Sequence, residues 1–206
     1  MLKLFHAWGS CSLASAIALE EAGAAHELVV MDTKAGDQRR PDYLAINPKA
    51  RVPALVADQG VLTETPAILA WIAQTWPAAQ LAPLDDPFAF AKAQAFNSYL
   101  CSTVHVAHAH KHRGYRWTDD PAAQAAMTKD VPKNEIACFR LIEDEMFEGP
   151  WVLGEGFSIC DAYLFTLFGW LPGDGVDTAQ FERLADHSRR VAARPAVRKV
   201  LALQAA

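Results

Sequence analysis

The chain changes its sequence pattern once, at a proline-rich segment, and this change limits the folds open to it. The segment "PAAQLAPLDDP" over residues 77–87 contains three prolines and no periodicity, which is typical of a linker. Before it, short apolar runs alternate between strand-like and helix-like spacing, and after it the pattern is helical. The sequence therefore predicts a small α/β domain over 1–77, a linker over 78–87 and an all-α domain over 88–206.

The α/β part has a recognisable order of predicted elements. "LKLF" and "HELVVMD" are typical of strands, and between them "SLASAIALEEAG" is typical of a helix that ends at Gly23. "VPALVAD" and "VLTE" indicate a hairpin around Gln59 and Gly60, followed by the helix "TPAILAWIAQTW". We therefore expect a βαβ unit followed by a ββα unit.

Charge and cysteine content exclude several classes of protein. The formal net charge is −5, and the longest basic cluster is only "KHRGYR", which argues against nucleic-acid or anionic-membrane partners. No apolar stretch is long enough for a signal peptide or a membrane span, so we expect a cytoplasmic protein. Cys11, Cys101, Cys138 and Cys160 contain no C-x-x-C pair, so we expect neither a disulfide framework nor a structural zinc site.

"GSCSLAS", residues 9–15, places a cysteine at the start of the first predicted helix. A helix N-terminus carries free N–H groups and partial positive charge, which favour the thiolate form of Cys11, and Ser10 can cap the same turn. The alternative is that Cys11 is a small buried residue beside a capping serine. This segment alone leaves both interpretations open.

Two further segments suggest a peptide ligand. If the Val52-Pro53 bond of "INPKARVPAL" is cis, Val52 turns its N–H and C=O toward an extended peptide. "TETPAIL" places Glu64 and Thr65 at a helix start, which suits the zwitterionic end of an amino acid. A strand-entry proline and an ordinary helix cap with Pro66 at its first turn remain the simpler alternatives.

Together, "GSCSLAS", "AINPKARVPAL" and "LTETPAI", followed by an all-helical domain, resemble the cytosolic glutathione transferases, most closely the bacterial beta class. The resemblance covers essentially the whole chain. It implies a thioredoxin-like first domain with Pro53 cis, a helical second domain, a homodimer, and glutathione as co-substrate with no metal.

The resemblance also implies where glutathione lies. The tripeptide would extend along Val52, with its γ-glutamyl end at the "TETPAIL" segment and its sulfur at Cys11. The implied glutathione-binding residues are Ser10, Cys11, Lys34, Val52, Pro53, Glu64, Thr65, Ser98 and His105. The chain departs from the family pattern near Lys34, where "TKAGD" is one residue shorter, and at Ser98, where the family commonly has asparagine.

The segment "SYLCSTVHVAHAHKH" carries a polar stripe. At about 100° per residue, Ser98, Cys101, His105, His108 and His112 share one helical face. The resemblance places His105 beside the cysteine, where it would hydrogen-bond the ligand and move a proton. The three histidines also have a spacing that could ligate zinc, but we expect no metal, because no carboxylate partner is evident nearby and the family is metal-free.

The later segments suggest a pocket for the second substrate, a small electrophile. "HRGYRW" adds Arg113 and Arg116 to the end of the histidine helix, and Tyr163 and Trp170 of "DAYLFTLFGW" share a face. The beta class has a similar aromatic pair. Core or dimer packing is the alternative for all of them. The predicted electrophile pocket comprises His108, Arg113, Tyr163 and Trp170.

One segment of the predicted helical domain has a role in folding and not in chemistry. In "GFSICDAYLF", Ser158 and Asp161 have the spacing of a reciprocal helix cap, which the resemblance also implies.

These patterns predict a glutathione-dependent transferase or thiol oxidoreductase with an activated thiol at Cys11, assisted by His105. Its substrates would be small electrophiles, mixed disulfides or peroxides. One alternative is isomerisation of an unsaturated diacid, as in the zeta class, in which the product would not retain glutathione. A second alternative is a non-catalytic regulatory protein of the same fold, which would not bind glutathione.

Overall fold

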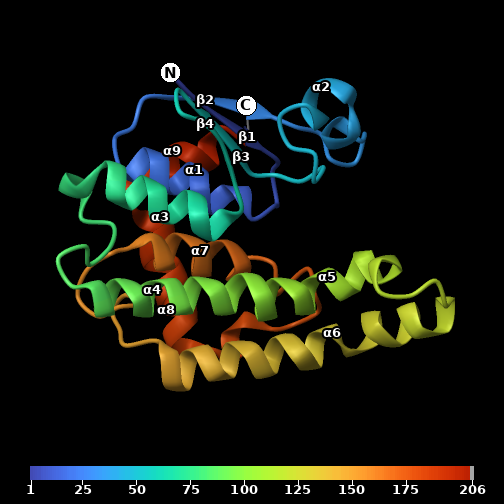
Figure 1. The fold of residues 1–206 in the computed structure, drawn as a ribbon. Helices are drawn as coiled ribbons and strands as arrows, with labels where there is room; N and C mark the ends of the chain where they lie inside the picture. The colour runs from blue at the N-terminus through green and yellow to red at the C-terminus, as the bar shows by residue number, and fades with distance from the viewer. Residues whose placement is uncertain (205–206) are drawn as a thin grey trace.

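A four-stranded sheet forms one end of the molecule (Figure 1). The computed structural model describes residues 1–204. The strand order is β2-β1-β3-β4, in which β2 runs parallel to β1 and the other neighbours pair antiparallel. The strands are β1 (Leu2–His6), β2 (His26–Val30), β3 (Ala54–Ala57) and β4 (Gly60–Thr63). The predicted hairpin is confirmed by the pairing of β3 with β4.

Two helices of the first domain pack between the sheet and the helical region. Helix α1 (Ser12–Glu21) ends before Gly23, whose φ of 64° is in the left-handed region that favours glycine. Helix α3 (Thr65–Thr75) packs beside α1, and both lie between the sheet and the helical region (Figure 1). The short helix α2 (Pro41–Leu44) lies at the side of the sheet, beyond the stacked layers.

The rest of the described chain is helical. Its α-helices are α4 (Pro87–Tyr99), α5 (His105–Arg113), α6 (Pro121–Leu141), α7 (Ile159–Phe168), α8 (Glu182–Ala193) and α9 (Pro195–Ala202). The fold class predicted from the sequence, α/β followed by all-α, is confirmed. The domain limits at 77 and 88 stay a prediction, and residues 205 and 206 of the predicted second domain lie outside the described residues.

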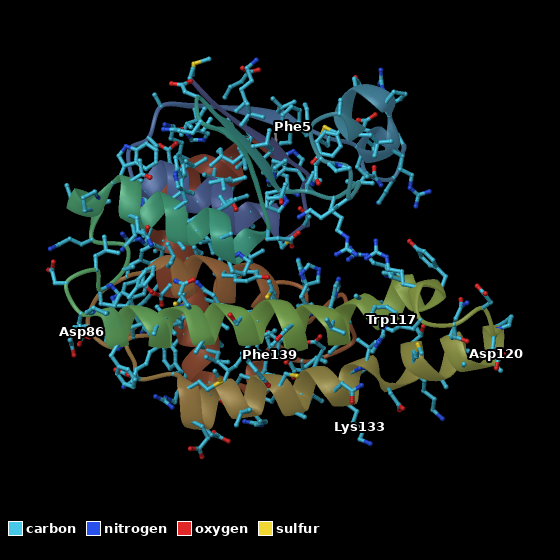
Figure 2. The ribbon with its side chains drawn as sticks, in the orientation of Figure 1. Phe5, Asp86, Trp117, Asp120, Lys133 and Phe139 are labelled. Carbon is cyan, nitrogen blue, oxygen red and sulfur yellow. The ribbon has the colours of Figure 1, made fainter. Side chains whose placement is uncertain are left out.

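The core of the helical region contains packed aromatic side chains. Figure 2 places Phe139 in the layer between α6 and helices α4 and α5, and its ring centroid lies 5.7 Å from that of Phe168 and 6.0 Å from that of Phe181. All three rings are buried, so they stabilise this layer mainly by removing apolar area from water. Within residues 1–204, no helix is long and apolar enough to cross a membrane.

The predicted cap of α7 is confirmed. The Ser158 Oγ accepts a hydrogen bond from the backbone N–H of Cys160, and the Ser158 N–H donates to the Asp161 carboxylate at 2.8 Å. This reciprocal arrangement satisfies backbone donors that a buried helix start would otherwise leave unpaired.

A π-helix over Leu100–Val104 separates α4 from α5. A π-turn holds more residues than an α-turn, so a stripe drawn at 100° per residue does not continue across it. The single polar stripe that the sequence predicts from Ser98 and Cys101 to His112 is therefore wrong as a continuous face. His105 and His108 lie after the π-helix, within α5, and remain on one face.

Candidate active site

Cys11 lies immediately before α1, at the N-cap position. Ser10 supports this turn, because its Oγ accepts from the Ser12 N–H at 3.2 Å and lies 2.6 Å from the Ser12 Oγ. The Ser12 Oγ in turn lies 2.8 Å from Nδ1 of His6, a buried residue that sequence reasoning missed. Burial lowers the pKa of His6 to about 4, so this imidazole is neutral behind the cysteine.

The segment before β3 faces the cysteine. The Val52-Pro53 peptide bond is cis, as the resemblance implies. The Cys11 Sγ lies 3.7 Å from the carbonyl oxygen of Val52, within the range of a weak thiol hydrogen bond. The thiol, the cis-proline segment and the start of α1 therefore meet at one place.

The acidity of Cys11 is set by two opposing effects. Burial raises the pKa of the thiol, while hydrogen bonding to Thr65 and the positive charge of Arg113 lower it. Burial is the larger effect, so the direction predicted from the helix N-terminus alone is wrong for the free protein. Only 8% of Cys11 is exposed, and this loss of hydration disfavours the thiolate.

Glu64 and Thr65 begin α3, as predicted. Glu64 has a φ of 71°, which is strained for a residue with a side chain, and such strain is often found at functional sites. Its Oε1 lies 2.5 Å from the Nζ of Lys49, which also donates to the Thr63 hydroxyl at 2.6 Å. Sequence reasoning missed Lys49, although it lies within the quoted segment "INPKARVPAL".

His105 is the second group assigned to the chemistry. The Nη1 of Arg113 lies 3.5 Å from its Nε2, and because a guanidinium only donates, Nε2 is an acceptor and Nδ1 carries the proton. Burial lowers the pKa of His105 to about 3, and the positive charges of Arg113, His108, Arg51 and Arg116 act in the same direction. The predicted role of proton carrier therefore needs correction. In the free protein at neutral pH this imidazole is neutral and weakly basic, suited to hydrogen bonding.

Trp170 connects His105 with His108. Its ring centroid lies 5.0 Å from that of His105 and 4.3 Å from that of His108. Trp170 thus contacts His108, which in turn lies near the His105 and Arg113 pair.

Tyr163 is buried, and burial together with the negative charges of Cys11, Cys101 and Glu64 raises the pKa of its phenol.

His108 has a carboxylate partner that the sequence did not reveal. Its Nδ1 lies 2.5 Å from Oδ2 of the buried Asp174, and the Nζ of Lys111 lies 3.3 Å from Oδ1. Burial and the charge of Asp174 raise the pKa of Glu135 to about 8, so Glu135 is largely protonated at neutral pH. The pair of His108 with Asp174 joins residues 66 positions apart, a separation that leaves no local sequence signal.

Two residues of the predicted glutathione set stand apart from this cluster. Lys34 is exposed, and within residues 1–204 its side chain makes no hydrogen bond or ion pair. Ser98 is exposed on α4, where its carbonyl oxygen accepts from the Cys101 Sγ at 3.3 Å. The neighbouring Asn97 is fully buried, and neither end of its amide has a hydrogen-bond partner in the described part of the chain. The roles of Lys34 and Ser98 stay predictions.

The histidines of α5 have a spacing that could ligate zinc. Across the described residues, no group of three or more His, Cys, Asp or Glu side chains is arranged to hold a metal ion.

The chain is similar in sequence to known glutathione S-transferases. The glutathione S-transferase N-terminal domain matches residues 1–74. The chain is 32% identical to glutathione S-transferase GstA of Escherichia coli over 98% of each chain. It is 27% identical to maleylacetoacetate isomerase of Pseudomonas aeruginosa, over 80% of this chain and 77% of that one.

Solved structures show the same similarity. A glutathione transferase homologue from Sulfitobacter with bound glutathione has a TM-score of 0.96 and 44% identity, covering 99% of this chain and 98% of its own. The bacterial beta class glutathione S-transferase of Sphingomonas chungbukensis has a TM-score of 0.81 and 34% identity over 98% of each chain. The first domain is accordingly thioredoxin-like and the second all-helical, and the chain belongs to the glutathione S-transferase family.

Proposed function

We propose that this protein binds glutathione along Val52 and uses the thiol of Cys11 in glutathione transfer or thiol–disulfide exchange. The observation that carries this proposal is that the start of α1 and the carbonyl of Val52 meet at one sulfur. The Thr65 side chain also lowers the pKa of that thiol. The bound glutathione of the Sulfitobacter homologue supports the choice of ligand.

The residues around the sulfur have distinct roles in this proposal. The free N–H groups and hydroxyl at the start of α3 bind the γ-glutamyl carboxylate, and Glu64 binds the ammonium group in place of Lys49. Arg113 stabilises negative charge on sulfur, because the charge of Cys11 and that of Arg113 favour each other. The neutral His105 donates from Nδ1 to the ligand.

In conjugation, the glutathione thiolate forms a bond to the electrophilic carbon, the leaving group departs with its electron pair, and the thiol proton passes to solvent. In disulfide exchange, the Cys11 thiolate forms a bond to one sulfur of a disulfide, and the other sulfur leaves as a thiolate. Conjugation would act on small electrophiles, and exchange would reduce mixed disulfides. With a peroxide, the Cys11 thiolate would attack one oxygen to form a sulfenic acid while the other oxygen leaves as water or an alcohol. Two glutathione molecules would then restore the thiol, with release of water and formation of glutathione disulfide.

A second candidate is a glutathione-dependent isomerase of an unsaturated diacid. It is favoured by the similarity to maleylacetoacetate isomerase and by the arginines near Cys11. The two functions differ in whether glutathione remains in the product, which mass spectrometry of the product decides.

The first prediction concerns Cys11. Oxidised glutathione should add one glutathione to this residue, with release of one reduced glutathione, and the rate should increase as the pH rises above neutral because the pKa of the thiol is raised. Intact-mass and peptide mass spectrometry measure both results. Cys160→Ala is the matched control, because Cys160 is fully buried and should not react.

Modification of Cys101 before Cys11 would contradict this prediction. Full disulfide-reducing activity of Cys11→Ala would also do so, and would move the sulfur contact to Ser10 or Ser12.

The second prediction concerns Glu64. Glu64→Ala should weaken glutathione binding by roughly 1.5–3 kcal/mol, the range for hydrogen bonds to charged groups, and it leaves the ammonium of Lys49 without its carboxylate partner. Isothermal titration calorimetry measures the effect, with the exposed Glu155→Ala as the charge-matched control. An unchanged dissociation constant would exclude Glu64 from the binding site.

The homodimer and the cytoplasmic location stay predictions. Membership of the glutathione S-transferase family supports the dimer, which sedimentation equilibrium would measure directly.

A further inference from the structure

Three arginines gather around His105. Arg113 lies at the end of α5 with its Nη1 3.5 Å from the imidazole, Arg116 follows it within the next turn, and Arg51 comes from the segment before Pro53. Arg116 lies three residues after Arg113, and Arg51 directly precedes Val52, whose carbonyl oxygen lies 3.7 Å from the Cys11 Sγ. The positive charges of Arg51 and Arg116 act on the pKa of His105 in the same direction as that of Arg113. Residues far apart in the sequence thus form one positive cluster.

This cluster has no carboxylate of its own. Among residues 1–204, none of the three guanidinium groups forms an ion pair, whereas Arg194, Arg190 and Arg140 each pair with an Asp or Glu side chain. Like charges near one another repel, and Arg113, which is half-buried, also loses hydration. An anionic ligand would remove this cost, and the guanidinium fork matches a carboxylate.

The cluster also lies beside the reacting sulfur. The negative charge of Cys11 and the positive charge of Arg113 favour each other. The Arg51 backbone is held in place, because its carbonyl oxygen accepts hydrogen bonds from the Tyr43 hydroxyl at 2.6 Å and the Asn47 amide at 2.7 Å. These bonds fix the backbone of Arg51 directly before Val52, the residue whose carbonyl faces Cys11, and leave the Arg51 side chain exposed.

Trp170, the aromatic neighbour of the arginine cluster, favours a flat ligand. Trp170 lies 5.0 Å from His105, so an aromatic surface stands next to the positive charges. A flat, conjugated molecule that carries a carboxylate matches both features.

We infer that Arg51, Arg113 and Arg116 form a carboxylate site for the second substrate, which is an aromatic or conjugated electrophile that carries negative charge. The inference rests on the proposed glutathione chemistry. The carboxylate itself is unchanged in the reaction, and the three guanidinium groups stabilise the negative charge that develops on the electrophile as sulfur attacks. The glycyl carboxylate of glutathione is the other source of the same chemical group, and the experiment separates the two.

The test uses two unreactive ligands that differ in charge. The protein is first saturated with S-methylglutathione, so that any site for the glycyl carboxylate is already occupied, and is then titrated by calorimetry with 3,5-dinitrobenzoate or its neutral analogue 3,5-dinitrobenzamide. We expect the benzoate to bind about tenfold or more tightly, as charge-assisted hydrogen bonds imply. This preference should weaken as salt is added.

Variants identify the residues responsible. Arg113→Met and Arg116→Met should each reduce the preference for benzoate severalfold, and the exposed Arg198→Met, with the same change of charge, should leave it unaltered. Arg116 is exposed, so its variant provides a test even if Arg113→Met fails to fold.

Other outcomes overturn the inference. Equal affinities for the two ligands, or no measurable benzoate binding, would do so while leaving glutathione binding intact. Variants that weaken S-methylglutathione but keep the benzoate preference would assign the arginines to the glycyl carboxylate. If S-methylglutathione does not bind, the proposed function fails, and the same pair of titrations on the free protein still decides whether the carboxylate site exists.

Discussion

Asp161→Ala should lower the free energy of unfolding by about 3–5 kcal/mol, the cost of breaking a buried charged network. The Asp161 carboxylate is fully buried and accepts hydrogen bonds from the backbone N–H groups of Val152 and Ser158, each at 2.8 Å. The Ser158 hydroxyl and Nε2 of His187 also lie 2.8 Å from it. Alanine would leave all of these groups without their partner.

Urea denaturation followed by circular dichroism measures this effect. The exposed Asp144→Ala, which removes one carboxylate from the surface, is the control and should change stability by less than about 0.5 kcal/mol. A loss below about 1 kcal/mol for Asp161→Ala would show that water or a rearranged loop replaces the carboxylate.

Asp174→Ala should lower the free energy of unfolding by about 3 kcal/mol, because it removes the buried partner of both His108 and Lys111. The same change should lower the pKa of Glu135, since the charge of Asp174 is one of the causes that raise it. The catalytic efficiency toward the electrophile should fall as His108 loses its fixed position against Trp170.

Urea denaturation and steady-state kinetics measure these effects, with the exposed Asp119→Ala as the control. Glutathione affinity should stay within about twofold, because Asp174 contacts none of the predicted glutathione residues. If the free energy of unfolding falls as expected but the catalytic efficiency is unchanged, Asp174 serves folding alone.

The strands and longer helices of the first domain, and the cap of α7 in the second, could be predicted because their signals are local. The cap of α7 needed only the spacing of Ser158 and Asp161, and the hairpin needed only Gly60 between two apolar runs. The π-helix over Leu100–Val104 has no such signature, so the polar stripe was extended through it.

The site was predicted where one segment carries the chemistry and was missed where two segments meet. Glu64 and Thr65 lie at a helix start that the sequence shows, but the pairing of Asp174 with His108 exists only after folding. The pKa of Cys11 is a similar case, because a local rule about helix ends predicts one direction and burial in the assembled fold decides the other.

The position of α9 has a consequence for synthesis. This helix packs against α1, and Arg194, directly before it, holds the Glu21 carboxylate through two hydrogen bonds of 2.5 and 2.7 Å. Because Glu21 and Arg194 are 173 positions apart, the ribosome makes the helix that follows Cys11 long before the helix that covers it. A nascent chain therefore carries an incompletely covered α1 until α9 has left the ribosome, and the first domain completes its packing only then.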